Sequence, residues 1–407
     1  MNTSCTSAGS ELSAPEKAIV LHACYVYHYL NDAITFILPT VMGLLYNRFS
    51  LNWIEAGIVY AMNLLVMIVF QVIMGYFSDI VDQKKIMLVG MALLGGSTIL
   101  MMLSVDFASL LLFATLLGIG LGIQHASSYS ISSRIKNEKV NRQAAAGDMG
   151  KGSAIIVSTL LVFFLNNDLS WRIPFLAWGI ATLVAMSIIA FKFREFCLYP
   201  AGFVKGKQTK PDIPPVESRK ATVRKIFALT SFFLLFMLYS AQFQVISNNL
   251  TTYMAEYKGF ETKVSPFFFV VFFLLAITGS SSSLALSKRV GKKRLVVTSY
   301  IVYLVVLVLY VLLDPRESVT NAIFCAVMAF FSYTVYPVIL ETMSGKTPRT
   351  HLGLAFGIVM GLGWVGGFVA SLLAGYFAQT FTAQSIFYIS IISVILSLVV
   401  LKKTGFT

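Results

Sequence analysis

Long apolar runs constrain this chain more than any other feature of its sequence. About twelve stretches of mostly apolar residues follow one another, separated by short polar segments. A helix that crosses a bilayer needs about 20 such residues, and in lipid only helices and closed barrels pair all their main-chain polar groups. The runs are too long for barrel strands and do not alternate between polar and apolar residues. The pattern therefore predicts an all-α integral membrane protein with about twelve transmembrane helices.

The expected helices form two sets on either side of a polar stretch. The first set covers residues 17–46, 53–78, 85–104, 108–133, 143–165 and 172–193. The second set covers residues 227–256, 264–287, 294–313, 318–342, 352–378 and 383–401. We therefore predict two six-helix bundles, at 17–193 and 226–402, joined by a basic cytoplasmic linker at 194–225 that is too polar to pack as a domain. Residues 1–16 and 403–407 are expected to be cytoplasmic tails.

The positive charge of the chain follows membrane topology. The formal net charge is +13, and the basic residues concentrate in alternate loops, such as those that contain Lys84, Lys85, Arg134 and Arg142. Cytoplasmic loops carry such an excess, so we expect both termini in the cytoplasm and the protein in a cell membrane, with a bacterial inner membrane as the best fit. Anionic membrane lipid, and no nucleic acid, is the expected partner of this basic surface.

A loop motif lies between the second and third expected spans. It reads GYFSDIVDQKK over residues 75–85, and a degenerate copy occupies residues 284–293 at the matching place in the second half. With Trp171 and Arg172 at the start of the sixth span, these segments resemble the major facilitator superfamily. The resemblance implies a transporter whose substrate site lies between two bundles near the middle of the membrane. It assigns a gating role to four residues of the loop: Gly75, Asp79, Lys84 and Lys85.

Two shorter patterns resemble one branch of that superfamily. HYLND at residues 28–32 and GIGLGIQH at residues 118–125 look like segments of the fosmidomycin-resistance type. The resemblance would imply efflux of phosphonate drugs, but Ala126 and Ser127 replace the proline and the acidic residue that are common there. The glycines of the second pattern do not indicate a nucleotide site, because no strand precedes them.

Ionisable residues within the first span form a candidate proton site. A charge at the centre of a membrane helix costs roughly 2.5 to 3.5 kcal/mol on insertion scales, so each one needs a partner or a function. His28 and Asp32 are four residues apart and share a helix face, with Tyr25 and Asn31 beside them. We predict that Asp32 and His28 bind a coupling proton. The alternative is that they form a closed structural pair.

The fourth and fifth spans add a second candidate group. His125 and Lys151 lie at the same expected depth, and Asp148 is three residues before Lys151 on the same helix face. These residues are predicted to line a cavity that attracts an anionic or zwitterionic solute. A structural Asp148–Lys151 pair is the competing interpretation.

The second half offers polar rather than charged candidates. Tyr239 and Gln242 on the seventh span, with Tyr333 and Tyr336 on the tenth, are predicted to donate or accept hydrogen bonds with a solute. Each of them is equally compatible with a buried core position. Small side chains recur at every fourth position in two series of the eleventh span, which predicts close helix contact. The series are Gly353, Gly357 and Gly361, and then Gly363, Gly367, Ser371 and Gly375.

Together these patterns favour a secondary transporter, coupled to protons, that moves a small polar or anionic organic solute by alternating access as a monomer. Two alternatives stay open: a facilitator or exchanger without proton coupling, and a multidrug efflux pump for cationic drugs. A membrane enzyme or receptor is a remote third, since the histidines and the four cysteines are scattered along the chain. No phosphate-binding loop indicates ATP as the energy source, and no cofactor, metal or catalytic residue is expected.

Overall fold

The computed structural model describes residues 14–134, 140–165, 167–193, 219–344 and 352–402. Within these ranges the chain forms twelve α-helices and one short π-helical turn. The first six are α1 (Ala14–Arg48), α2 (Trp53–Ser78), α3 (Gln83–Met101), α4 (Phe107–Arg134), α5 (Val140–Leu165) and α6 (Leu169–Lys192). The others are α7 (Arg219–Thr252), the π-helical turn η1 (Tyr253–Tyr257), α8 (Ser265–Val290), α9 (Lys292–Leu313), α10 (Ser318–Ser344), α11 (Leu352–Thr380) and α12 (Ser385–Leu401).

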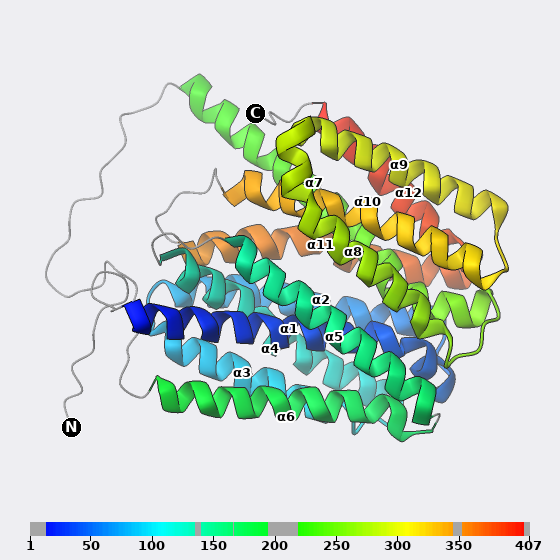
Figure 1. Cartoon of the computed structure of the whole chain (residues 1–407), viewed down its shortest axis with the longest axis horizontal. Helices are drawn as coiled ribbons and strands as arrows, with labels where there is room; N and C mark the ends of the chain where they lie inside the picture. The colour runs from blue at the N-terminus through cyan, green and yellow to red at the C-terminus, as the bar shows by residue number, and fades with distance from the viewer. Residues whose placement is uncertain (1–13, 135–139, 166, 194–218, 345–351, 403–407) are drawn as a thin grey trace, which may run out of the picture.

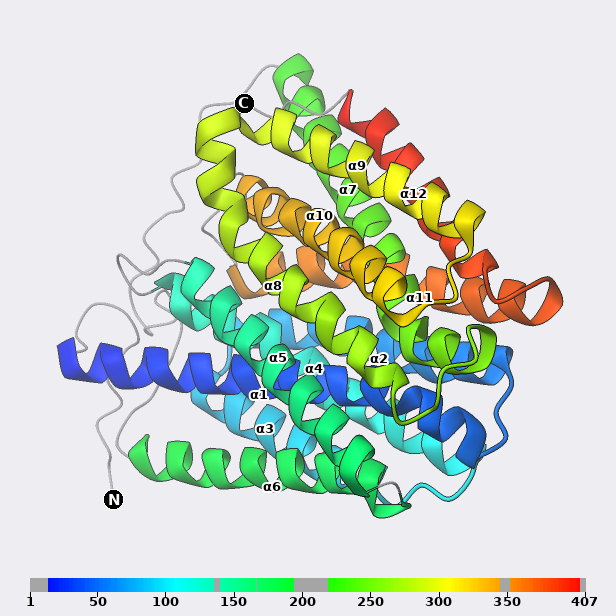
Figure 2. The same cartoon turned by 45° about the vertical axis from the view of Figure 1, so that its right-hand side comes forward.

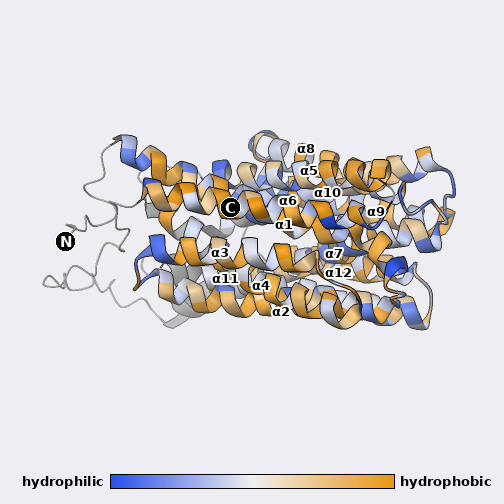
Figure 3. Ribbon diagram, turned by 90° about the horizontal axis from the view of Figure 1, so that it is seen from below, coloured by the Kyte–Doolittle hydropathy of each residue, from blue (hydrophilic) through white to orange (hydrophobic). Residues whose placement is uncertain are grey.

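These helices confirm the predicted architecture of about twelve spans. Eleven of the described helices are long and apolar enough to cross a membrane, and α12 is a shorter apolar helix of 17 residues. Apolar residues cover the sides of the bundles, while hydrophilic residues gather at the helix ends and in the loops (Figure 3). The side surface therefore suits lipid, and the two ends suit water.

Helix boundaries differ by a few residues from those that the hydropathy pattern predicted, and two helix starts change the expected tail and linker. α1 begins at Ala14, inside the expected tail, and α7 begins at Arg219, inside the expected linker. Hydropathy detects only the part of a helix that suits lipid, whereas main-chain hydrogen bonding continues into polar residues beyond it. The rest of the predicted tails and linker, at 1–13, 194–218 and 403–407, lies outside the described residues.

Successive helices run antiparallel and form two bundles, α1–α6 and α7–α12, which lie side by side (Figures 1 and 2). We call the end of the molecule where α1 begins and α12 ends the terminal face, and the opposite end the far face. Within the first bundle α1 packs on α5 and α2 packs on α4; in the second, α8 packs on α10 and α7 packs on α11 and α12. Between the bundles, α2 and α11 share the most extensive contact.

Small residues permit the close approach of α2 and α11. A Cβ atom added to Gly57 would lie 2.8 Å from the main-chain oxygen of Ser371, and one added to Gly357 would lie 2.6 Å from that of Gln71. Such contacts allow two backbones to pack at a distance that larger side chains would prevent. The contact runs along both halves of α2, which confirms the close packing predicted from the spacing of small residues in α11.

Hydrogen bonds also join the two bundles at the far face. The Asn47 side-chain amide donates to Glu256 Oε1 at 2.7 Å, and Thr251 Oγ1 donates to the main-chain oxygen of Pro39 at 2.7 Å. Asn47 and Pro39 belong to α1, whereas Thr251 belongs to α7 and Glu256 to η1. These bonds therefore hold the two bundles together on this side. The far face is therefore closed between α1 and α7.

A buried lysine at the end of η1 pairs with the loop between α9 and α10. Lys258 Nζ lies 2.6 Å from Asp314 Oδ1 and 4.8 Å from the centre of the Tyr310 ring, and its side chain is fully buried. Burial lowers the pKa of Lys258, although Asp314 acts in the opposite direction. Burial also acts to raise the pKa of Asp314, but the hydrogen bond and charge of Lys258 outweigh it and hold that pKa below its usual value. The far end of the second bundle is thus anchored by an ion pair.

The packing of α1 against α5 generates a stability prediction. Gly150 lies against the main chain of Tyr29, so a Cβ atom at this position would overlap backbone that has no room to move. Gly150→Ala should destabilise the folded protein by about 1–3 kcal/mol, the usual cost of overpacking. Thermal unfolding in detergent measures this loss, and Gly96→Ala is the matched control because no atom lies within 4 Å of its added Cβ. Equal melting temperatures for the two variants would contradict the packing.

Candidate functional site

A cluster of charged side chains lies halfway along the first bundle. Asp32 is near the middle of α1, one turn after His28, and Asp148 and Lys151 are one turn apart on α5. Lys151 Nζ lies 3.1 Å from Asp32 Oδ2 and 3.0 Å from Asp148 Oδ1. His28 Nε2 lies 3.4 Å from the same oxygen of Asp32. The two pairs predicted from helix spacing therefore join into one network through Lys151.

The network is buried and carries an imbalance of charge. The side chains of Asp32, Asp148 and Lys151 are 9%, 13% and 14% exposed. With neutral histidines, two carboxylates face one ammonium group, so the cluster holds one excess negative charge. Charges at this depth are expensive unless they are paired and hydrogen-bonded. Lys151 satisfies this requirement for both carboxylates at once.

Glycines of α5 bring the two helices close enough for this contact. A Cβ atom on Gly147 would overlap Asp32 Oδ2 and would lie 2.9 Å from His28 Nε2. The sequence Gly147-Asp148-Met-Gly150-Lys151 thus places two residues without side chains against α1 and puts the charged residues beside them. The local sequence of α5 provides both the space and the charges.

His125 from α4 joins the cluster through the ring of His28. The two imidazole rings meet edge to face with their centres 5.2 Å apart, and His125 is 8% exposed. One ligand atom each from His28, Asp32 and His125 lies within 4.8 Å of the others. The scattering of the histidines along the chain had indicated no such cluster, and the fold contradicts that reasoning because it brings α1 and α4 together. Lys151 already contacts the Asp32 oxygen, so this arrangement favours a charge network over a bound metal ion.

A small cavity of about 60 Å³ adjoins the cluster between the two bundles. It has room for a few water molecules. Its lining includes nine residues that the sequence marked as candidates: His28, Asn31, Asp32, His125, Asp148, Lys151, Tyr239, Tyr333 and Tyr336. The structure therefore brings candidates from both halves of the chain to one place.

Tyr25 and Gln242 are the two candidates that do not line this cavity. Tyr25 is half-buried nearer the terminal face, and its ring meets that of His22 with centres 6.2 Å apart. Gln242 is fully buried, and its main-chain oxygen accepts a hydrogen bond from Ser390 of α12 at 2.8 Å. The glutamine that α7 places in the lining is Gln244.

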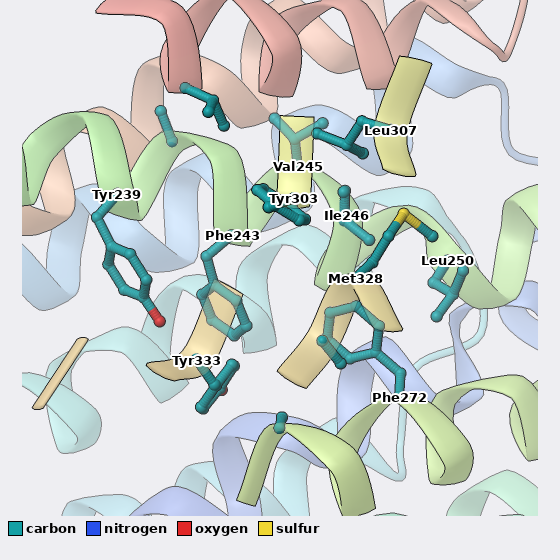
Figure 4. Close-up of a cluster of buried hydrophobic side chains, with 14 of the residues drawn as sticks. Tyr239, Phe243, Val245, Ile246, Leu250, Phe272, Tyr303, Leu307, Met328 and Tyr333 are labelled. Atoms are coloured by element: carbon teal, nitrogen blue, oxygen red, sulfur yellow. The ribbon is translucent and has the colours of Figure 1, made fainter. Parts of the chain in front are cut away.

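Aromatic side chains of the second bundle form the opposite wall of the cavity. Tyr239 and Phe243 extend from α7 toward Tyr333 of α10 (Figure 4). The Tyr239 and Tyr336 rings are stacked with centres 5.4 Å apart, and those of Phe243 and Tyr333 meet edge to face at 5.1 Å. These rings belong to the buried core of the second bundle, so the wall is rigid as well as partly polar.

Sequence reasoning missed several residues that complete the site. Ser280 of α8 donates a hydrogen bond to Asp148 Oδ2 at 3.0 Å and so links the charge network to the second bundle. Phe36 lies below the ammonium group of Lys151, 5.8 Å from ring centre to nitrogen. Asn63 and Trp364 also line the cavity. The run of four serines at 280–283, inside an apolar span, was a sequence signal for Ser280. The other three residues carry no comparable signal.

The predicted gating loop lies at the terminal face. Gly75 of α2 packs against Gly357 of α11, and Asp79 is buried at the end of α2. Lys84 Nζ donates to the main-chain oxygen of Phe193 at 3.0 Å, which ties the loop to the end of α6, while Lys85 is exposed. The loop therefore contacts α6 within its own bundle and α11 across the interface.

These features define a membrane transporter built from two six-helix bundles, with a polar site at their interface. The pattern of the Major Facilitator Superfamily matches residues 23–344. The chain therefore belongs to the major facilitator superfamily, as its loop motifs predicted.

Curated relatives are transport and resistance proteins of similar length. The fosmidomycin resistance protein of Escherichia coli (strain K12) is 22% identical over 393 residues, covering 91% of this chain and 90% of that protein. The 3-(3-hydroxyphenyl)propionate transporter of the same strain is 23% identical over 332 residues, covering 80% of this chain and 78% of that protein. An uncharacterised transporter of this superfamily from Methanocaldococcus jannaschii is 25% identical over 390 residues, or 92% of each chain.

Solved structures of transporters share the fold. A mutant of the nucleoside transporter NupG aligns with a TM-score of 0.72 at 11% identity, over 94% of this chain and 99% of that one. A bacterial homologue of the human lysosomal transporter Spinster, solved inward-facing and unoccupied, aligns with a TM-score of 0.68 at 14% identity, over 96% of each chain. At such low identity the likeness concerns the fold alone.

The charge network generates a second stability prediction. Lys151→Met leaves two buried carboxylates facing each other without a cation, so it should destabilise the protein by about 3–5 kcal/mol. Asp148→Asn keeps the contact between Lys151 and Asp32 and should cost less. Thermal unfolding of both variants in detergent tests this order, with the exposed Lys293→Met as a control that should leave stability unchanged. Equal losses of stability in the Lys151 and Asp148 variants would contradict this prediction, because they would show that Asp32 does not need Lys151 as its ion-pair partner.

Proposed function

We propose that this protein is a proton-coupled secondary transporter that moves a small polar or anionic organic solute by alternating access. The observation that carries the proposal is the position of Lys151, held between Asp32 and Asp148 beside a cavity that both bundles line. We place both termini in the cytoplasm, because the basic loops follow that orientation. We further assign the protein to a bacterial inner membrane, as a monomer.

An anionic group fits this site through exchange of contacts on Lys151. The ammonium group has two carboxylate partners, so a solute carboxylate or phosphonate that displaces one of them leaves Lys151 paired. Tyrosine hydroxyls from Tyr239, Tyr333 and Tyr336 supply hydrogen-bond donors on the opposite wall. The solute would therefore contact both bundles at once.

Charge balance couples such a solute to protons. The cluster already holds one excess negative charge with neutral histidines, so an added anion would double it in a medium of low dielectric. A proton that arrives with the anion keeps the net charge unchanged. Asp32 and His28 are the acceptors placed for this role, since both line the cavity and Asp32 shares Lys151 with Asp148. Each anion would then travel with at least one proton.

The way in which the bundles meet supports the proposal of alternating access. The far face is closed by bonds between α1 and α7, and the cavity is too small for an organic solute. Binding and release therefore require the bundles to separate at one face and then at the other. The close backbone contact of α2 with α11 offers a surface on which they can rock.

Two of the relatives support an organic solute. One is a fosmidomycin resistance protein, and another transports 3-(3-hydroxyphenyl)propionate, which is a carboxylate. Both align with most of this chain. We take an organic acid of similar size as the first substrate class to test.

The excess negative charge also favours a second candidate, a multidrug efflux pump for cationic drugs. Two carboxylates outnumber one lysine, and the rings of Tyr239, Tyr336 and Trp364 provide faces for a cation. A ligand panel separates the two candidates, because organic anions should raise the unfolding temperature in the first case and organic cations in the second. A facilitator without proton coupling would respond to ligands but not to a pH gradient.

A proton-accepting role for Asp32 predicts a specific transport defect. Asp32→Asn should abolish accumulation of an organic acid such as 3-(3-hydroxyphenyl)propionate driven by a pH gradient in proteoliposomes, because the amide cannot take up the coupling proton. Exchange of labelled against unlabelled solute should continue, since it needs no net proton movement. The far-face Asp168, whose ion pair with Arg48 is half-exposed, supplies the control Asp168→Asn.

Two outcomes would contradict this proposal. Retained accumulation in Asp32→Asn would remove Asp32 from proton coupling. Loss of both accumulation and exchange in Asp32→Asn, with normal folding, would assign Asp32 to solute binding or to the conformational change instead.

A further inference from the structure

A groove opens toward the surrounding membrane between the first turns of α1 and the last turns of α6. Its volume is about 520 Å³, and aliphatic or aromatic side chains form most of its walls. Ile19, Val26 and Ile188 from these walls are 38%, 41% and 55% exposed, so the groove is open on the side surface of the first bundle. None of its lining residues borders the central cavity. It is therefore a feature separate from the transport site.

The groove has the length of part of a lipid tail. Along α1 it extends from Ala18 to Val26, which is about 12 Å of helix. Half of the hydrocarbon core of a bilayer is about 15 Å thick. Both helices reach the terminal face here, with the start of α1 and the end of α6 on the same side of the molecule (Figure 1). The groove thus runs from one membrane surface into a single leaflet.

Basic side chains stand at the surface end of the groove. Among the described residues of its lining, His22 and Lys192 are the polar ones, both are exposed, and none is acidic. His22 Nδ1 contacts the main-chain oxygen of Ala18 at 2.6 Å, which fixes its ring at this end. Lys84 adds a second lysine, because its ammonium group binds the main-chain oxygen of Phe193, another lining residue. Positive charge therefore sits where a lipid phosphate would lie.

We propose that this groove binds one anionic phospholipid of the leaflet at the terminal face. The acyl chain lies between α1 and α6, and the phosphate contacts Lys192 and His22. A zwitterionic lipid fits the apolar walls equally well, but its own cationic group lies close to Lys192 and Lys84. The site is therefore selective for the headgroup charge rather than for the tail, and the lipid fastens two helices of the first bundle.

Native mass spectrometry of the full chain tests this site directly. The purified protein is mixed in detergent with equal amounts of phosphatidylglycerol and phosphatidylcholine that carry the same acyl chains, and the retained lipid is counted. The wild type should retain phosphatidylglycerol preferentially. Lys192→Met should lower the ratio of the two lipids about five-fold, the effect of removing one basic side chain near the membrane surface. Lys402→Met, at the end of α12 on the same face, is the matched control and should leave the ratio unchanged.

A second variant tests the groove itself. Ile188→Trp places a large ring between α1 and α6, so it should reduce the retention of both lipids without changing Lys192. The proposal is overturned if the wild type retains the two lipids equally or if Lys402→Met lowers the ratio as much as Lys192→Met. It is also overturned if Ile188→Trp retains both lipids as the wild type does. None of these outcomes depends on which solute the protein transports or on proton coupling.

Discussion

A lysine held between two carboxylates inside the membrane is the interaction on which the site depends. Lys151 neutralises charge on Asp32 of α1 and Asp148 of α5, and Ser280 of α8 completes the hydrogen bonding of Asp148. A buried charge without a partner is costly, so the loss of one contact in this charge network would destabilise the groups that remain. Because α8 belongs to the second bundle, the charge state of the first bundle is linked to the contact between the two.

This link connects the charges that line the small cavity to the interface between the two bundles. In this arrangement Lys151 pairs with both carboxylates, and the cavity beside them has space for only a few water molecules. The hydrogen bond between Ser280 and Asp148 is the contact by which this network reaches the second bundle. In the proposed function, a solute or proton that binds at Lys151 would change the interface through this bond. The glycines of α2 and α11 keep a second interface between the bundles close-packed.

The sequence was sufficient to predict the fold and part of the site. Apolar runs located the helices, and spacing of four and three residues predicted the His28–Asp32 and Asp148–Lys151 pairs, which the structure contains. The contact between Lys151 and Asp32 was beyond sequence reasoning, because it depends on how closely Gly147 and Gly150 let α5 approach α1. Helix orientation was also beyond sequence reasoning: α7 carries polar residues on several sides, and it places Gln244 rather than Gln242 in the cavity.

Proton uptake on solute binding is the most direct measure of the central claim that Lys151, Asp32 and Asp148 bind an anion and a proton together. Isothermal titration calorimetry with 3-(3-hydroxyphenyl)propionate, in two buffers of different ionisation enthalpy, counts the protons that the protein takes up. We expect a net uptake that approaches one proton per anion in the wild type and disappears in Asp32→Asn. Binding of the anion without proton uptake by the wild type would contradict the account.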